Sequence, residues 1–101
     1  MSMHTRWVVI PCFNEAARLN NAAVLELLAE QNLGIVLVDD GSDDGTRELI
    51  FQIQQANSNV EVLVLQHNVG KAEAVRRGMN HALTLGAEVI GYLDADFATP
   101  P

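Results

Sequence analysis

The chain has 101 residues, of which 49% are hydrophobic and 19% charged, and this composition predicts one soluble globular domain rather than a disordered or fibrous chain. Its formal net charge of -7 at pH 7 argues against a nucleic acid or an anionic membrane as the partner, because both would repel the protein. A phosphate-bearing small molecule is still compatible, since one metal ion or a few backbone amides can reverse the local potential.

The single cysteine, Cys12, cannot form a disulfide within the chain, and we expect a small structural residue at a strand end rather than a nucleophile. Residues 1–6 lack the pattern of a signal peptide, and no apolar run approaches the roughly 18 residues that cross a bilayer. We therefore expect a cytoplasmic protein. The sequence leaves open whether a longer parent chain is associated with a membrane.

Four short apolar runs predict strands. Their nearly continuous hydrophobicity is typical of parallel strands that are covered on both faces. The expected strands are residues 7–10, 35–38, 60–65 and 89–93.

Helical spacing separates these runs. The first helix is expected at about residues 16–31, the second carries the apolar stripe Leu49, Ile50, Ile53, and the third has Val75 and Met79 on one face. Gly34 and Gly86 are expected to end the first and third helices. The alternation predicts a three-layer α/β/α sandwich with a mainly parallel sheet, a Rossmann-like arrangement formed by one domain over residues 1–101.

A polar loop follows each expected strand. In open parallel sheets, ligands bind outside the carboxyl ends of the strands. We therefore expect these loops to meet at one edge of the sheet and to form the functional site. The loops are residues 11–15, 39–46, 68–71 and 94–96.

Asp94 and Asp96 directly follow the last strand, with one residue between them. One short segment thus presents two hard oxygen ligands, which suit Mg²⁺ or Mn²⁺ with open positions for diphosphate oxygens. Aspartates also commonly form turns, so this spacing alone leaves both interpretations open.

Asp39 and Asp40 are adjacent carboxylates at the end of the second strand. Their like charges repel, and such a pair is tolerated most readily where a ligand or donor amides receive it. One of them is a candidate to accept a hydrogen bond from a nucleobase or a ribose hydroxyl. The alternative is a carboxylate that closes the turn with Gly41. We expect Asp43 or Asp44 to cap the following helix.

Lys71 opens the third helix, where the helix dipole disfavours a cation. A phosphate bound near Gly70 would compensate, because free amides and the ammonium would face the same anion. The alternative is an ordinary solvated lysine, or one paired with the region of Glu73. In the first loop, Glu15 is suited to hold ribose hydroxyls or to favour the helix N-terminus, and Phe13 to lie against a base or to fill the core.

Taken together, four segments resemble the inverting family 2 glycosyltransferases of GT-A fold. They are V-V-I-P-C-F-N-E at residues 8–15, V-D-D-G-S-D-D-G-T at 38–46, N-V-G-K-A-E-A-V-R-R-G at 68–78 and Y-L-D-A-D at 92–96. The resemblance extends from Val8 to Pro101. The lysine after Gly70 and the ending A-V-R-x-G look closest to the polyprenyl-phosphate (dolichyl-phosphate-like) hexosyltransferases.

This resemblance implies a UDP- or GDP-linked sugar as donor and a single displacement at the anomeric carbon with inversion. Asp94 with Asp96 would engage the metal, Mg²⁺ or Mn²⁺, and the diphosphate, and Asp40 would contact the base. The residues that the resemblance assigns to nucleotide binding are Pro11, Phe13, Glu15, Asp40, Lys71 and Asp94.

Two departures from the family pattern concern the end of the chain. Ala98 offers no side-chain ligand where some relatives have a polar residue, and the general base and the acceptor site are expected beyond Pro101. We therefore expect a donor-binding part that is truncated relative to a full enzyme and is inactive by itself. Missing neighbours would leave a sheet edge exposed, which favours self-association.

Two other functions fit parts of the pattern. A phosphorelay receiver domain also gathers acidic residues and a lysine at strand ends, but its acidic pair usually follows the first strand rather than the second. A noncatalytic nucleotide-binding or assembly module would equally lack the general base. Sequence beyond Pro101 would favour the enzyme over the module.

Overall fold

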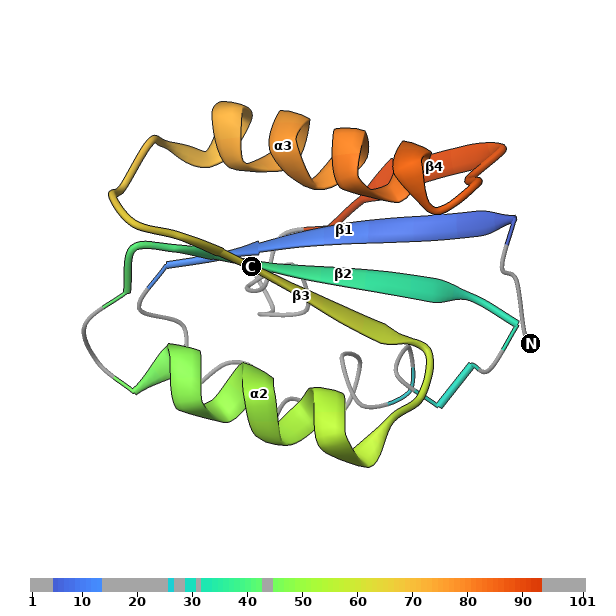
Figure 1. Ribbon diagram of the computed structural model, residues 1–101, viewed down its shortest axis with the longest axis horizontal. Coiled ribbons are helices and arrows are strands. Elements are labelled where there is room, and N and C mark those ends of the chain that lie inside the picture. Colours follow the sequence, from blue (N-terminus) through green and yellow to red (C-terminus); the bar gives the residue numbers. More distant parts are fainter. Residues whose placement is uncertain (1–4, 14–25, 27–28, 31, 43–44, 94–101) are drawn as a thin grey trace, which may run out of the picture.

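The computed structural model describes residues 5–13, 26, 29–30, 32–42 and 45–93 (Figure 1). Over these residues the elements are β1 (Arg6–Cys12), β2 (Gly34–Asp40), α2 (Thr46–Ala56), β3 (Val60–Leu65), α3 (Lys71–Thr84) and β4 (Val89–Tyr92). The helix expected at about residues 16–31 lies largely outside the described residues. No helix in these ranges is both long and apolar enough to span a bilayer.

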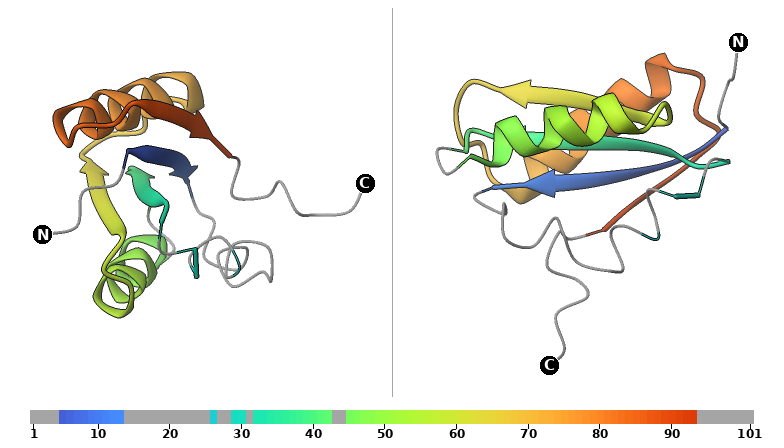
Figure 2. Two further views of the ribbon diagram at one scale, coloured as in Figure 1. Left: turned by 90° about the vertical axis from the view of Figure 1, so that its right-hand side faces the viewer. Right: turned by 90° about the horizontal axis from the view of Figure 1, so that it is seen from below.

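The four strands form one parallel sheet in the order β3-β2-β1-β4. The α2 helix covers one face of the sheet and α3 covers the other, as the two sides of Figure 1 and the end view of Figure 2 show. This arrangement confirms the predicted three-layer α/β fold with a parallel sheet.

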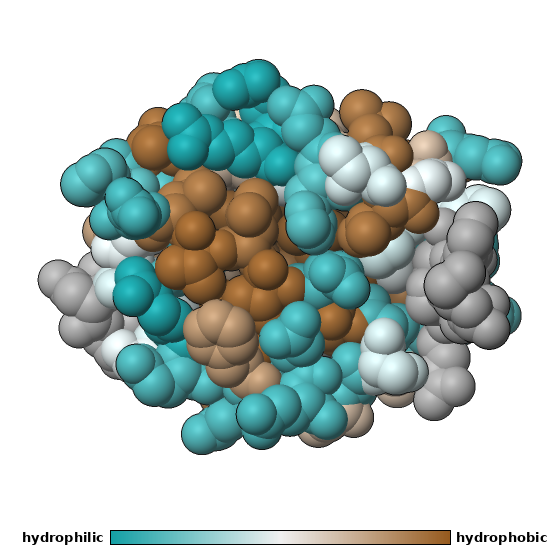
Figure 3. Space-filling view, in the orientation of Figure 1, coloured by the Kyte–Doolittle hydropathy of each residue, from teal (hydrophilic) through white to brown (hydrophobic). Residues whose placement is uncertain are grey.

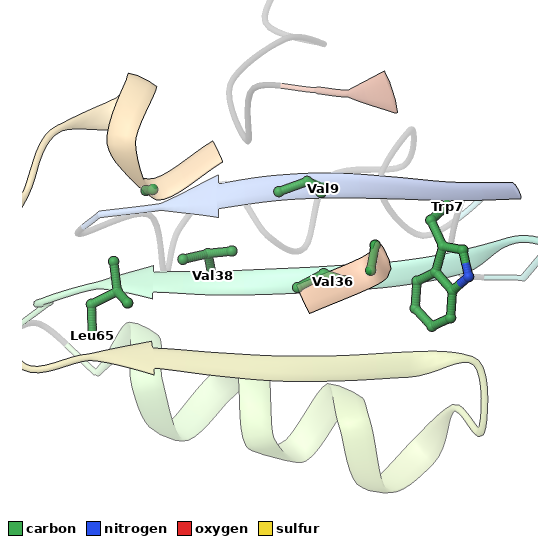
Figure 4. Close-up of a cluster of buried hydrophobic side chains, with 7 residues drawn as sticks. Trp7, Val9, Val36, Val38 and Leu65 are labelled. Atoms are coloured by element: carbon green, nitrogen blue, oxygen red, sulfur yellow. The ribbon is translucent and has the colours of Figure 1, made fainter. Parts of the chain in front are cut away.

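Two hydrophobic clusters hold the layers together, one on each face of the sheet. Neighbouring residues of β1 and β2 point to opposite faces, so each strand contributes to both clusters. The cluster toward α2 contains Ile10, Cys12, Ile35, Leu37, Ile50 and Val60. The cluster toward α3, part of which Figure 4 shows, contains Trp7, Val9, Val36, Val38, Leu65, Ala74 and Ala82.

Cys12 is fully buried in the first cluster, and its thiol lies 3.5 Å from the carbonyl oxygen of Ile10. A thiol buried among apolar side chains is typical of a structural cysteine rather than a reactive one. The expectation of a small structural residue at a strand end is confirmed.

The third helix packs on the centre of the sheet through a glycine. A Cβ atom on Gly78 would lie 2.4 Å from Cγ1 of Val9 and 2.9 Å from Cγ2 of Val38. Any side chain at this position would therefore push α3 away from β1 and β2. The expected apolar stripe of this helix is confirmed, since Val75, Gly78 and Ala82 are buried.

The two glycines expected to end helices differ in their roles. Gly86 follows α3 with a φ of 91°, a conformation that favours glycine, and it ends the helix as predicted. Gly34 is instead the first residue of β2, where a Cβ atom would lie 2.4 Å from Cδ2 of Trp7. Its assignment as a helix terminator was wrong. Glycine is needed at this position because the indole ring of Trp7 leaves no room for a Cβ atom.

Candidate functional site

The order of the strands identifies where a ligand would bind. The chain builds β1, β2 and β3 in one direction across the sheet and then returns to place β4 on the other side of β1. The connections therefore diverge between β1 and β4. At such a point in an open parallel sheet, a crevice forms outside the carboxyl ends of the strands, and ligands bind there.

The end of β1 lies at this point of the sheet. The β4 strand pairs with Arg6 to Val9, so Pro11 lies beyond its end, and among the described residues Pro11 pairs with Val38 of β2. Proline has no backbone N–H to donate. Because β4 has already ended at this position, Pro11 removes no hydrogen bond between β1 and β4. Pro11 is buried, whereas Phe13, the first residue after the strand, is 43% exposed. Of the two candidates from the sequence, Phe13 therefore offers its ring to solvent.

The last described residue of the chain lies against β1. The backbone N–H of Leu93 donates a hydrogen bond of 2.9 Å to the carbonyl oxygen of Val9. The chain therefore leaves β4 beside β1 and on the carboxyl side of the sheet. Three predicted site residues lie outside the described residues: Glu15, Asp94 and Asp96. Within the described ranges, no group of three or more His, Cys, Asp or Glu side chains is placed to hold a metal ion.

Asp39 closes the turn between β2 and α2. Its carboxylate is fully buried, and Oδ2 accepts a hydrogen bond of 2.9 Å from Nε of Arg47 in α2. Its Oδ1 accepts a bond of 3.1 Å from the backbone N–H of Ser42. The turn-closing role that the sequence left open for this pair thus belongs to Asp39.

Asp40 points to the opposite face of the sheet and contacts the loop that leads into α3. Its Oδ1 accepts a hydrogen bond of 2.7 Å from the backbone N–H of Val69. Its Oδ2 accepts bonds of 3.1 Å from the backbone N–H of Gly70 and from the side-chain amide of Asn68. Only 3% of Asp40 is exposed. Amide groups therefore bind this carboxylate, whereas that of Asp39 is bound by one amide and by the guanidinium of Arg47.

Lys71 is the first residue of α3, as predicted, and Gly70 before it has a φ of 91°. Lys71 lines a pocket of about 430 Å³ together with Ala72, Val75 and Tyr92. This pocket therefore lies between the start of α3 and the end of β4. Tyr92 is 52% exposed and was not predicted from the sequence as a site residue. The available signal was its place as the last residue of a strand before the acidic segment.

The outer face of α3 carries a compact charge cluster. Glu73 accepts hydrogen bonds of 2.8 Å from Nε of Arg76 and 2.9 Å from Nε of Arg77, and both arginine side chains are largely exposed. The Arg76 guanidinium, followed by that of Arg77, lowers the pKa of Glu73 from 4.5 to about 2. In turn, Glu73 raises the pKa of Arg76. These two arginines form part of the exposed face of α3.

The chain is similar to known proteins over nearly its whole length. The sequence model of the family described as glycosyl transferase family 2 matches residues 7–101. The chain is 35% identical over 99 residues to an undecaprenyl-phosphate 4-deoxy-4-formamido-L-arabinose transferase of Edwardsiella ictaluri, covering 93% of this chain and 30% of the relative. The relative of the same name from Salmonella paratyphi B shares 35% identity, with 29% of its length covered. The chain therefore spans less than a third of these relatives.

Solved structures show the same fold at lower identity. The mannosyltransferase PcManGT from Pyrobaculum calidifontis, solved in complex with GDP-Man and Mn²⁺, matches with a TM-score of 0.76 and 23% identity, over 95% of this chain and 28% of that chain. A structure of residues 1–349 of S. aureus TarS in complex with UDP matches with a TM-score of 0.65 and 23% identity, over 90% of this chain and 27% of that one. Both likenesses concern the fold.

Proposed function

The chain belongs to glycosyl transferase family 2, and on this premise we propose that residues 1–101 bind a UDP- or GDP-linked sugar, complexed with a divalent metal ion, as the donor of a hexosyl group. The observation that carries the proposal is the meeting of loops at the carboxyl end of the sheet. Leu93 leaves β4 beside β1, while Lys71 and Tyr92 line one pocket. Membership of this family also excludes the alternative of a phosphorelay receiver.

The nucleoside part of the donor would lie near the end of β1. The half-exposed ring of Phe13 offers a face for a base, beside the buried Pro11. We assign Glu15 and Asp40 to the same part of the site. The ammonium of Lys71, at the helix N-terminus, supports a place for phosphate oxygens nearby.

We propose that Asp94 and Asp96 hold the metal, Mg²⁺ or Mn²⁺. Asp39 and Asp40 already receive internal donors, so the hard oxygen ligands would come from the segment after β4. A bound divalent ion would offset the charge of the diphosphate leaving group. The complex of PcManGT with GDP-Man and Mn²⁺, a protein of the same fold, supports this metal class.

We further propose that the acceptor is a polyprenyl phosphate. The relatives are named undecaprenyl-phosphate 4-deoxy-4-formamido-L-arabinose transferases, and these names support this class of acceptor. The acceptor site and the general base would belong to segments outside residues 1–101. We place the reaction in the cytoplasm, consistent with a lone, buried thiol.

Copies of the chain are proposed to associate through β3, the edge strand on the side away from β4. Figure 3 shows apolar side chains gathered along this strand between α2 and α3. Its sequence, VEVLVL, contains one charged residue and neither lysine nor proline, the residues that commonly protect an edge from pairing.

A nucleotide titration tests the proposed donor site. UDP or GDP with Mg²⁺ should shift the amide NMR signals of residues near Phe13, Lys71 and Tyr92 in the ¹⁵N-labelled chain. Asp94→Ala should remove the metal dependence of these shifts. The control Glu61→Ala removes a carboxylate at the amino end of β3 and should leave them unchanged. Unchanged wild-type spectra at millimolar nucleotide, in a folded sample, would contradict the proposal.

A further inference from the structure

We propose that two copies of the chain pair through β3 in one register, in which the strands run antiparallel about a two-fold axis at Leu63. The four-stranded sheet of one copy would then continue directly into the sheet of the other. The inference specifies the association between copies and rests on that part of the proposed function. It does not depend on the donor site, because β3 lies at the edge of the sheet away from β4.

The backbone of β3 faces β2 and the open edge at alternate residues. The N–H of Ile35 in β2 donates a hydrogen bond of 2.9 Å to the carbonyl oxygen of Asn59, and Ile35 pairs with Val60 in the parallel ladder. A residue in such a ladder bonds to the two residues that flank its partner, so the odd-numbered residues of β3 turn their backbone groups toward β2. The N–H and C=O groups of Val62 and Val64 therefore point away from β2, toward the edge that is open among the described residues.

The side chains of β3 have the burial of a strand with a neighbour on one side. Residues 61–64 are half-buried, whereas every residue of β2, which lies between β1 and β3, is buried. Apart from Glu61, these half-buried residues are apolar: Val62 packs toward α2, and Leu63 packs toward α3. Figure 3 shows the apolar surface that lies along this strand. A further strand at this edge would remove apolar side chains on both faces from water.

A second copy of the chain fits this edge because the edge is complementary to itself. A two-fold axis perpendicular to the sheet brings β3 against its own copy in the antiparallel direction, and the contact closes without leaving a further β3 edge. In an antiparallel pair, two opposed residues whose backbone groups face each other exchange both of their hydrogen bonds. With the axis at Leu63, Val62 of each copy lies opposite Val64 of the other. The outward backbone groups of both valines are then satisfied in both copies.

The charge of Glu61 distinguishes this register from its neighbours. An axis at residue 61 would place two carboxylates directly opposite each other, which is destabilising. An axis at Val62 would leave them about 7 Å apart along the strands, whereas an axis at Leu63 separates them by about 14 Å, more than the screening length of roughly 8 Å at physiological ionic strength. An axis at Val64 would place Val62 opposite Gln66, beyond the end of the strand. The register at Leu63 therefore keeps the backbone bonds and separates the like charges.

A groove between β3 and α3 is suited to receive the carboxylate. Its volume is about 370 Å³. Glu61 points to the α3 side of the sheet, since its Oε1 lies 3.5 Å from Nε2 of His81. In the proposed register, Glu61 of one copy lies opposite Leu65 of the other and on the same face. Its carboxylate thus approaches the groove that Arg77 of the other copy borders, and the opposite charges favour the contact. The residues that line the groove are Leu63, Leu65, Arg77, Asn80, His81 and Thr84.

Cysteine cross-linking tests the register. In Leu63→Cys the new thiols meet at the axis as a non-hydrogen-bonded pair with Cα atoms about 4.5 Å apart, a separation that a disulfide can span. Mild oxidation should convert most of this variant into a covalent dimer. The wild-type chain, whose Cys12 is buried, should not cross-link.

Val62→Cys and Val64→Cys are the matched controls, because each of these residues lies opposite the other and not opposite itself. Each variant alone should cross-link far less than Leu63→Cys. An equimolar mixture of the two should cross-link more than either alone, which tests the same register without a substitution at the axis.

Amide hydrogen exchange in the wild-type chain tests the use of the edge without any substitution. Exchange at Val62 and Val64 should be slower at high protein concentration than at low concentration, because pairing gives their N–H groups acceptors. Exchange at Glu61 and Leu63 should change less, since their N–H groups already point toward β2.

The outcomes separate the register, the association and the donor site. Cross-linking that is strongest in Val62→Cys or Val64→Cys alone, or equal at all three positions, would overturn the register. Unchanged exchange at Val62 and Val64 in a sample that sediments as a dimer would assign the contact to another surface and overturn the inference. A wild-type chain that sediments as a monomer at every concentration would overturn both the inference and the proposed association. Failure of the nucleotide titration would contradict the donor site and leave these results unaffected.

Discussion

At the scale of single residues, Glu73 gives a prediction about pH. Its pKa is lowered from 4.5 to about 2 by Arg76 first and Arg77 second. Because folding lowers this pKa, the ion pairs stabilise the native state fully above pH 4.5, and the contribution is lost as the pH falls toward about 2. NMR titration of the Glu73 carboxyl should give a midpoint well below 4.5 at low salt.

The arginine variants provide the comparison. Arg76→Ala should raise the midpoint of Glu73 more than Arg77→Ala, because Arg76 is the larger cause of the shift. The cluster is exposed, so added salt should move the midpoint toward its ordinary value as well. Equal midpoints in the wild type and Arg76→Ala would show that the pair does not form in solution.

The acidic doublet shows what the sequence could and could not provide at this scale. Adjacent carboxylates predicted that a ligand or donor amides receive the charge. Amides bind Asp40, whereas Asp39 is bound by one amide and by the guanidinium of Arg47. The sequence could not tell which residue serves which helix. That depends on the alternation along β2, which turns Asp39 toward α2 and Asp40 toward the segment before α3. The functional assignment of Glu15, Asp94 and Asp96 stays a prediction.

At the scale of elements, the contact of α3 with the sheet depends on Gly78. Alanine would gain up to about 1 kcal/mol in helix propensity, but overpacking a core typically costs about 1–3 kcal/mol. The buried, β-branched Val9 and Val38 have little freedom to move away. We expect Gly78→Ala to lower the free energy of unfolding by about 1 kcal/mol, measured by urea denaturation.

A second substitution tests the cause. In a Val9→Ala background, the nearest methyl group is gone, so Gly78→Ala should cost less than in the wild type. Additive costs would show that the destabilisation has another origin.

The strands were predicted in the right places but too short at the first two. The expected run at 7–10 extends over Arg6–Cys12, and that at 35–38 over Gly34–Asp40. Hydrophobic patterns end where apolar side chains end, whereas the backbone ladder continues into polar residues that find partners. The order β3-β2-β1-β4 could not be predicted from these runs, because apolar side chains do not specify which strand lies beside which.

At the scale of the whole molecule, the open edge at β3 leads to a prediction about assembly. Val64→Lys places a charge on this edge strand and should shift the sedimentation of the protein toward the monomer at high concentration. The reason is that a second copy could no longer pair there without burying the charge.

Val89→Lys is the matched control on the other edge strand, β4, where Val89 is 60% exposed. It should leave self-association unchanged. A larger effect at Val89 than at Val64 would assign the contact between copies to β4 instead. A wild-type chain that is monomeric at every concentration would exclude association through either edge strand.

The pairing of β1 with β4 has a consequence for how the molecule assembles during synthesis. Arg6 meets Val89, so one side of β1 stays open until β4 has left the ribosome, while β2 can already pair with its other side and β3 with β2. The pairing of β1 with β4 thus joins segments that lie far apart in the sequence. A ligand that contacts both β1 and β4 would stabilise this late pairing. It would slow the detachment of β4 and protect the amides of β4 from hydrogen exchange.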